Sequence, residues 1–385
     1  MKLPITVAYV SVDDPNDRRS WSGTNHFLLR ALQAQVATVK VFGPLRPQPE
    51  LFLCQAINQV LLRTTGKRFN YRDSFVMAKA YARMIGPQLH GVDLVVAPAG
   101  LATTALLRTK VPIVHINDRC IAGAIGYHRI LNDLARFSQQ ESLALEQQAL
   151  KNAALTVYAS QWAADAAMRS APELASKVKV VPFGANLEHM PPAQAARRFP
   201  SERIRLLFLG VNWEDKGGPI ALQALRELKN RGVAAQLVVC GCTPPADITD
   251  PDMLCEGFLD KNEPVQAKRL EEHLRAADML ILPTRFEAYG IVCCEAAAYG
   301  LPVLATRTGG IPTIVQEGVT GFLFDMNEDG VAYADRVMRL AQAPDHWQAM
   351  RTAARARSEQ VLNWTAFTHE LLRLAQEVLS VNKAR

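Results

Sequence analysis

The sequence lacks the run of about 20 apolar residues that a membrane-spanning helix requires. Its opening stretch, MKLPITVAYVSVDD, has no charged n-region, no long apolar segment and no cleavage site. We therefore expect a first β-strand there and not a signal peptide. The seven cysteines are odd in number and follow no metal-binding spacing, which predicts reduced, mostly buried thiols in a cytoplasmic protein.

Low-complexity tracts and internal repeats are also missing from the 385 residues, of which 49% are hydrophobic and 21% charged. A globular chain of this length predicts two domains.

Residues 1–190 hold 21 basic and 13 acidic side chains, and the remaining residues hold 22 basic and 24 acidic ones. The basic half predicts an anionic acceptor or peripheral contact with the inner face of an acidic membrane. The alternative is a solvated surface, because the charges of RTTGKRFNYR are scattered. We expect no nucleic-acid partner.

Short apolar strands alternate with helical patterns along the whole chain. The strands are ITVAYVSV, TVKVFGP, DLVVAPA, PIVHIND, LTVYAS and KVKVVPFG, followed by RLLFLG, AQLVVCG, DMLILP and LPVLAT. This alternation predicts an α/β fold with parallel sheets covered on both faces. The rhythm stops in a proline-rich segment, so we expect a first domain at 1–185, a linker at 186–203 and a second domain at 204–362. The remaining residues, 363–385, predict a helix that can pack back on the first domain.

Two carboxylates, Glu287 and Glu295, lie eight residues apart in RFEAYGIVCCEA. Glu287 precedes any plausible helix, whereas Glu295 lies inside one. Carboxylates accept hydrogen bonds from hydroxyls, so the pair can hold two polyol groups on either side of a central anion, as in a nucleotide sugar. The alternative is that Glu287 only favours the helix dipole and that Glu295 lies on the surface.

The helix between these carboxylates predicts an anion site. It starts near Gly290 and ends at Gly300, with Pro302 as a stop. The amides of Gly290, Ile291 and Val292 are free of intrahelical acceptors at the positive end of the helix dipole, where phosphate binds. Gly290 has no side chain to obstruct an approaching anion.

The longer stretch RFEAYGIVCCEAAAYGLPVLATRTGGIPTIVQEGVTGFLF resembles the E-x7-E block of glycosyltransferase family 4. The members of this family are retaining enzymes with the GT-B fold. The resemblance implies two Rossmann-like domains with parallel sheets facing an interdomain cleft. It also implies that Glu287 contacts the donor sugar, that Glu295 contacts the nucleotide ribose, and that Gly309 and Gly310 form a turn facing the donor.

The stretch FLGVNWEDKGG resembles the family's strand–Gly-Arg–x4–Lys-Gly element, whose arginine and lysine neutralise the diphosphate. Lys216 and Gly217 match this pattern. Val211 stands at the arginine position, which leaves one cation fewer at the phosphates. Without the resemblance, Lys216 would be interpreted as a solvated loop lysine.

The stretch CEGFLDKN resembles the family segment that holds the nucleotide base through backbone groups. The residues that match are Gly257, Phe258 and Leu259. An ordinary turn is the alternative interpretation of this segment.

In the N-terminal half, RRSWSGTNHFLLRAL resembles the glycine loop that follows the first strand in this family. Gly23 is its glycine, although Thr24 could serve only as a helix N-cap. In PIVHINDRC, Asp118 stands at the end of the strand, at the position where many members of the family carry a histidine near the donor sugar. We expect Asp118 near the reacting groups and His115 packed in or beside the strand. A carboxylate there can orient an acceptor hydroxyl or accept its proton.

These resemblances predict a retaining glycosyltransferase that moves a sugar from a nucleotide-diphosphate sugar to a carbohydrate or lipid-linked acceptor. The donor is a substrate, and no cofactor is expected. No Asp-x-Asp lies in a suitable loop, which predicts metal-independent transfer. Surface polysaccharide or glycolipid synthesis fits the basic first half. The alternatives are a GT-B epimerase or phosphorylase and an inactive nucleotide-sugar-binding protein.

Overall fold

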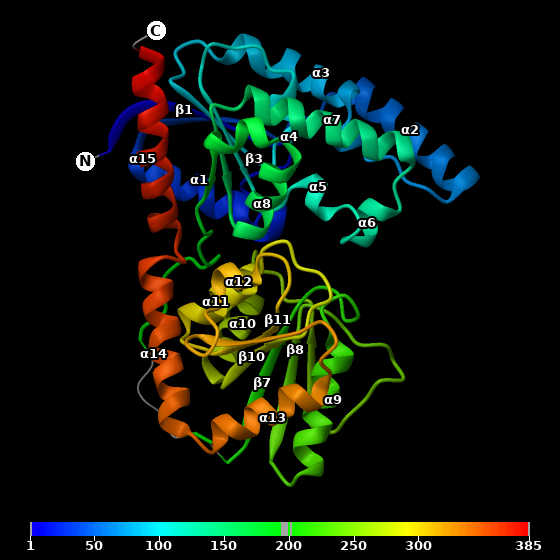
Figure 1. Cartoon of the computed structure of the whole chain (residues 1–385), viewed down its shortest axis with the longest axis vertical. Coiled ribbons are helices and arrows are strands. Elements are labelled where there is room, and N and C mark those ends of the chain that lie inside the picture. Colours follow the sequence, from blue (N-terminus) through cyan, green and yellow to red (C-terminus); the bar gives the residue numbers. More distant parts are fainter. Residues whose placement is uncertain (1, 194–198, 201, 384–385) are drawn as a thin grey trace. The chain divides into compact units, whose positions relative to one another are not determined.

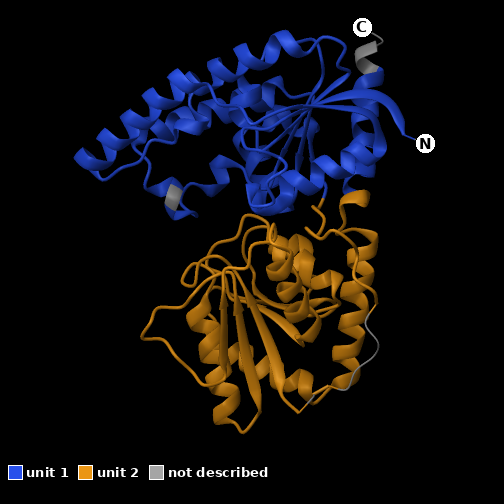
Figure 2. Ribbon diagram, turned by 180° about the vertical axis from the view of Figure 1, so that it is seen from behind, with its two compact units in different colours: residues 1–181, 367–385 blue, residues 182–366 orange. Residues whose placement is uncertain are grey.

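The chain forms two compact α/β units in a computed structural model that describes residues 2–193, 199–200 and 202–383 (Figures 1 and 2). Unit 1 comprises Met1–Val181 with Phe367–Arg385, and unit 2 comprises Pro182–Ala366. Each unit contains one six-stranded parallel sheet, which confirms the α/β prediction. Residues 194–198 and 201 of the predicted linker lie outside the described residues.

The sheet of unit 1 has the strand order β2-β1-β3-β4-β5-β6. Its central strands β3 and β4 are buried along their whole length, which explains their continuous apolar sequences. The strands are β1 (Leu3–Val10), β2 (Val36–Phe42), β3 (Leu94–Pro98), β4 (Ile113–Asn117), β5 (Leu155–Tyr158) and β6 (Val178–Val180).

The sheet of unit 2 has the order β12-β11-β10-β7-β8-β9, which is the Rossmann order 3-2-1-4-5-6 read from the other edge. The chain direction along the sheet reverses between β7 and β10. The two edge strands, β9 and β12, were not among the predicted strands. The strands are β7 (Ile204–Leu209), β8 (Ala235–Cys240), β9 (Met253–Gly257), β10 (Met279–Leu282), β11 (Val303–Thr306) and β12 (Gly321–Phe324).

Helices lie between consecutive strands of each sheet, except between β8 and β9, which a loop connects. Unit 1 contains α1 (Thr24–Gln35), α2 (Gln48–Thr65), α3 (Phe75–Ile85), α4 (Leu101–Ala105), α5 (Ile121–Ala124), α6 (Arg129–Asn132), α7 (Arg136–Asn152) and α8 (Gln161–Ser170). Unit 2 contains α9 (Gly218–Asn230), α10 (Pro264–Ala276), α11 (Ile291–Ala298), α12 (Ile311–Ile314), α13 (Gly330–Ala341) and α14 (Pro344–Gln360). The last helix, α15 (Trp364–Lys383), belongs to unit 1 from Phe367 onward.

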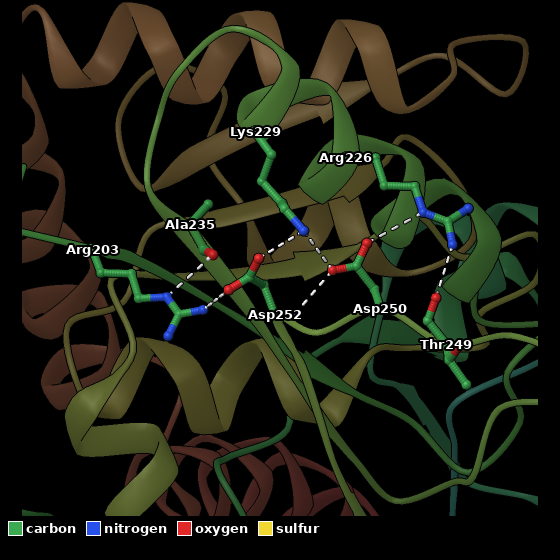
Figure 3. Close-up of polar contacts among 7 residues, drawn as sticks. All are labelled: Arg203, Arg226, Lys229, Ala235, Thr249, Asp250 and Asp252. Atoms are coloured by element: carbon green, nitrogen blue, oxygen red, sulfur yellow. Dashed lines mark hydrogen bonds and ion pairs between the residues drawn. The ribbon is translucent and has the colours of Figure 1, made fainter.

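An ion network joins the end of α9 to the start of β9 in unit 2 (Figure 3). Lys229 Nζ lies 2.7 Å from Asp250 Oδ1 and 2.6 Å from Asp252 Oδ2. Arg226 pairs with Asp250 at 3.4 Å, and Arg203 pairs with Asp252. The Asp-x-Asp sequence formed by Asp250 and Asp252 is therefore engaged by cations of the fold itself.

We expect Asp250→Asn to weaken the acid dependence of the stability of unit 2. Burial raises the pKa of Asp250, but hydrogen bonds from Lys229, the Asp252 amide and Arg226 outweigh burial, so its pKa is lowered. The ionised carboxylate therefore stabilises the fold above its unfolded pKa of about 3.9, and this stabilisation is lost as the pH falls through the lower folded value. Urea unfolding at several pH values measures the effect, which we expect to be about 1–3 kcal/mol at neutral pH.

Glu271→Gln is the control for this change, because Glu271 forms a half-exposed pair with Arg275 on one turn of α10. Such pairs contribute about 0.5 kcal/mol or less. If the stability of Asp250→Asn fell with acid in parallel to that of the unsubstituted protein, the network would not be the source of the acid sensitivity.

Candidate functional site

Two loops meet at the carboxyl edge of the sheet in unit 2, one after β7 and the other after β10. These strands are neighbours where the strand order reverses, which is the position at which ligands bind in open α/β sheets. The Arg285 amide donates to the Asp215 carbonyl at 2.8 Å, and Thr284 Oγ1 donates to the same carbonyl at 3.1 Å. These bonds make the two loops one scaffold for the side chains they carry.

The scaffold brings together two predicted site residues, Lys216 and Glu287. Lys216 Nζ lies 2.7 Å from Glu287 Oε2 and donates to the Phe286 carbonyl at 3.2 Å. The side chains are only 18% and 15% exposed, so solvent screens the pair little. The ammonium can face an anion and the carboxylate can accept hydroxyls, and each fixes the position of the other. Lys216 is thus not a solvated loop lysine.

Gly217 places Lys216 by starting α9 in a backbone conformation that favours glycine, with φ at 77°. A Cβ added to Gly217 would stand 1.9 Å from the Pro283 carbonyl oxygen. The loops after β7 and β10 can approach closely only because this side chain is absent. This contact gives a local reason for the Lys-Gly pair in the sequence.

We expect Gly217→Ala to destabilise unit 2 by at least about 3 kcal/mol, because left-handed strain and a backbone clash add together. The matched control is Gly232→Ala. Gly232 has nearly the same φ, 75°, but an added Cβ there meets nothing within 4 Å. Strain alone should then cost about 1–2 kcal/mol. Thermal or urea unfolding measures both, and equal losses would contradict the close approach at Pro283.

Helix α11 starts where the sequence predicted. Gly290 precedes it with φ at 101°, and Gly300 follows its end with φ at 65°. Ile291 and Val292 are the first helical residues, and amides at these positions have no acceptor within the helix. A Cβ on Gly290 would lie 3.5 Å from Glu287 Cγ, so the helix start and the Lys216–Glu287 pair are adjacent.

Glu295 is fully buried within α11, which overturns the alternative that it lies on the surface. Its Oε1 pairs with Lys261 Nζ, and Lys261 is 28% exposed. Its Oε2 has no hydrogen-bond partner among the described residues. A buried carboxylate oxygen without a donor is costly, so this atom is a candidate acceptor for a ligand hydroxyl.

Sequence reasoning missed Lys261 as a member of the site. It lies in the stretch CEGFLDKN, two residues after the segment expected to hold a base, but lysine at that place belongs to no pattern that the sequence displays. Only the fold places it beside Glu295, 34 residues further along the chain. The pair supplies the counter-charge that a buried carboxylate needs.

The remaining predicted residues of unit 2 lie in loops at the carboxyl ends of its strands. Gly257 ends β9 with φ at 69°, and its carbonyl accepts the Gly241 amide at 2.7 Å. Phe258, the next residue, is 58% exposed, and Leu259 is partly exposed. The Gly309–Gly310 turn follows β11, with φ at 53° at its first glycine.

In unit 1, the loop after β1 carries Gly23 and approaches the end of β4. Gly23 precedes α1 with φ at 92°, so Thr24 is the first helical residue and not the N-cap. Trp21 and Ser22 also have positive φ, 49° and 55°, a strained conformation that is concentrated at functional sites. Trp21 Nε1 donates to Asp118 Oδ2 at 2.9 Å. Sequence reasoning missed this indole, which fixes the carboxylate orientation.

His115 lies within β4 and is fully buried, as expected for a residue packed in the strand. Burial lowers its pKa to about 4, so the imidazole is neutral at physiological pH. Neither ring nitrogen has a hydrogen-bond partner among the described residues. Asp118, which follows the strand and is partly exposed, is the more accessible of the two groups.

Comparisons with known proteins agree with this geometry. Residues 203–343 match the family model described as glycosyl transferases group 1. The solved structure of Anabaena HepE in complex with UDP and glucose covers 97% of this chain and 100% of that chain, with a TM-score of 0.65 and 15% identity. Sucrose-phosphate synthase from Thermosynechococcus elongatus covers 98% and 100%, with a TM-score of 0.68 and 18% identity. The chain has the GT-B fold.

A curated relative shows over how much of the chain the sequence similarity extends. The D-inositol 3-phosphate glycosyltransferase of Frankia alni is 30% identical over 221 residues, which are 53% of this chain and 54% of the relative. The chain thus spans about half the length of the curated relatives it matches. Within the described residues, no helix is both long and apolar enough to cross a membrane.

Proposed function

We propose that this GT-B chain is a retaining, metal-independent glycosyltransferase of family 4 that uses a nucleotide-diphosphate sugar as donor. The observation that carries the proposal is the grouping at one edge of the sheet in unit 2: the Lys216–Glu287 pair stands beside the start of α11, and α11 carries Glu295. A cation, helix amides and two carboxylates are the groups that a diphosphate flanked by two polyols requires.

Each part of the donor has a candidate partner in unit 2. The diphosphate lies at the amides of Ile291 and Val292 with Lys216 Nζ beside it. The sugar hydroxyls donate to Glu287, and the ribose hydroxyls donate to the unpartnered Oε2 of Glu295. The base lies along the backbone of 257–259. The UDP and glucose named for HepE support a nucleotide sugar as the ligand class.

The reaction breaks the bond between the anomeric carbon and the diphosphate oxygen and forms a bond from that carbon to an acceptor hydroxyl. Negative charge develops on the departing diphosphate. Lys216 and the dipole of α11 stabilise this charge through contacts that are preorganised before the reaction. The acceptor hydroxyl loses a proton, and Asp118 is the candidate group to orient this hydroxyl and to accept the proton.

We expect Asp118→Asn to lower kcat/KM for the acceptor about tenfold or more, because the amide cannot take up a proton. Trp21→Phe is the control, since it keeps the carboxylate and replaces the indole, with the N–H that orients this carboxylate, by a smaller aromatic ring. The effect of Trp21→Phe should be smaller and should leave the pH profile in place. Unaltered kinetics in Asp118→Asn would make His115 the candidate again.

We further infer a cytoplasmic enzyme whose acceptor is a carbohydrate or a lipid-linked sugar in surface polysaccharide or glycolipid synthesis. The basic N-terminal half, with 21 basic and 13 acidic side chains in residues 1–190, supports an anionic acceptor or contact with the inner face of a membrane. The name of the relative contains D-inositol 3-phosphate, so this compound belongs among the candidate acceptors to be tested.

The test is a screen of nucleotide sugars for thermal stabilisation, because a ligand that binds the folded state raises the unfolding temperature according to its affinity. The stabilising donor is then incubated with candidate acceptors in the presence of EDTA, and nucleotide release is measured. We expect acceptor-dependent release that EDTA does not abolish. Conversion of the donor without acceptor would indicate an epimerase. Stabilisation without turnover would indicate a binding protein, a reading that Val211 at the expected arginine position supports.

A further inference from the structure

Helix α2 of unit 1 presents an apolar face to solvent. Phe52 is 76% exposed, Leu53 is 53% exposed and Val60 is 61% exposed, and Ile57 at 39% lies between them. These positions fall on one side of a helix with 3.6 residues per turn. A contiguous exposed apolar face on a folded domain marks an interaction surface.

This outward face contributes nothing to the core of unit 1. Cys54 is the only fully buried residue among the 18 of α2, and it packs into the core with the partly buried Leu51 and Leu61 on the opposite side of the helix. Both views of the ribbon show α2 at the outer edge of unit 1 (Figures 1 and 2). The helix is therefore apolar on two sides, and the fold uses only one of them.

The charge around α2 indicates what covers its outward face. The 22 residues from Leu51 to Arg72 contain four basic side chains and no acidic one, and the acidic residue in the first turn of α2, Glu50, is paired with Arg83. Arg63, Lys67 and Arg68 are exposed at the carboxyl end of the helix and in the turn after it. Apolar residues flanked by basic ones on an exposed helix match the interface of a bilayer with negatively charged headgroups.

We propose that α2 docks unit 1 on the surface of an anionic phospholipid bilayer. Phe52, Leu53 and Val60 enter the boundary between headgroups and acyl chains, and Arg63, Lys67 and Arg68 contact lipid phosphates. The inference narrows the membrane contact proposed above to one helix and does not depend on the transfer reaction.

The test is co-sedimentation of the full chain with vesicles of phosphatidylcholine alone and of phosphatidylcholine mixed with phosphatidylglycerol. We expect binding to the mixed vesicles that weakens with salt. Two triple variants should each bind at least about tenfold more weakly. One is Phe52→Ser, Leu53→Ser and Val60→Ser, and the other is Arg63→Gln, Lys67→Gln and Arg68→Gln. Circular dichroism verifies that each variant stays folded, which we expect because the substituted side chains are exposed.

Matched controls carry the same kinds of change on unit 2. Val265→Ser with Val319→Ser removes exposed apolar side chains, and Lys268→Gln with Arg339→Gln removes exposed charges. These variants should bind like the unsubstituted protein. Equal binding to both vesicle types, or full binding by the α2 variants, would overturn the proposal.

A protein partner on α2 is the competing occupant. If light scattering showed a dimer without lipid, and the serine variant converted it to a monomer, a second copy would cover the face and the proposal would be wrong. The nucleotide-sugar screen does not involve α2. Stabilisation by a donor together with absent vesicle binding would therefore reject this inference and leave the proposed transferase in place.

Discussion

We expect Glu287→Gln to lower kcat for sugar transfer by about two orders of magnitude or more, while unit 2 keeps its fold. The carboxylate accepts sugar hydroxyls that must be held while the anomeric carbon becomes electron-poor, and glutamine offers one acceptor where glutamate offers two. The substitution also removes the charge opposite Lys216, 2.7 Å away, so the cation loses its fixed position. Steady-state kinetics with the donor identified by the thermal screen measures the effect.

The control for this variant is Glu317→Gln, which removes a half-exposed carboxylate that pairs with Arg307 elsewhere in unit 2. Its turnover should match that of the unsubstituted protein. Urea unfolding separates chemistry from folding, because the loss of one partly buried pair should cost only about 1–3 kcal/mol. Near-normal transfer by Glu287→Gln would remove Glu287 from the proposed role.

We expect Lys216→Met to weaken the binding of the donor's nucleoside diphosphate at least about tenfold and to lower kcat as well. Methionine keeps much of the alkyl stem of Lys216 but carries no charge. This stem packs against Gly210, where an added Cβ would lie 2.8 Å from Lys216 Cγ. Val211 supplies no cation at the neighbouring position, so Lys216 is the cation that the loop after β7 offers. Calorimetric titration with the diphosphate and with the parent nucleoside measures the difference.

Lys216→Arg distinguishes charge from shape at this site, since it retains the cation and changes the hydrogen-bonding geometry. It should recover part of the lost affinity. The double variant Lys216→Met with Glu287→Gln should be less impaired than the sum of the single effects, because the two side chains hold each other. Unchanged diphosphate affinity in Lys216→Met would contradict its role at the donor.

The sequence predicted those parts of the fold that repeat a local pattern. Buried strands such as β3 and β4 are continuously apolar, and α11 is bounded by Gly290 and Gly300, whose φ values only glycine adopts readily. The edge strands β9 and β12 were missed. β9 is partly exposed along its length, so its sequence carries no buried run, and its pairing depends on β8.

The candidate site divides in the same way. Lys216 and Glu287 were predicted as site residues because their motifs lie in local stretches, and the fold places their side chains 2.7 Å apart. Lys261 and Trp21 were missed, because their importance comes only from contacts with Glu295 and Asp118, formed across long sequence separations. No periodicity or spacing in one sequence encodes such contacts.

The most direct test of the account is a crystal structure of the chain with the nucleoside diphosphate of its donor. We expect phosphate oxygens within about 3 Å of Lys216 Nζ and of the first amides of α11. A ribose hydroxyl should donate to Glu295 Oε2, which has no partner among the described residues. A nucleotide bound elsewhere, or bound with its diphosphate away from Lys216 and Gly290, would contradict the donor site described for unit 2.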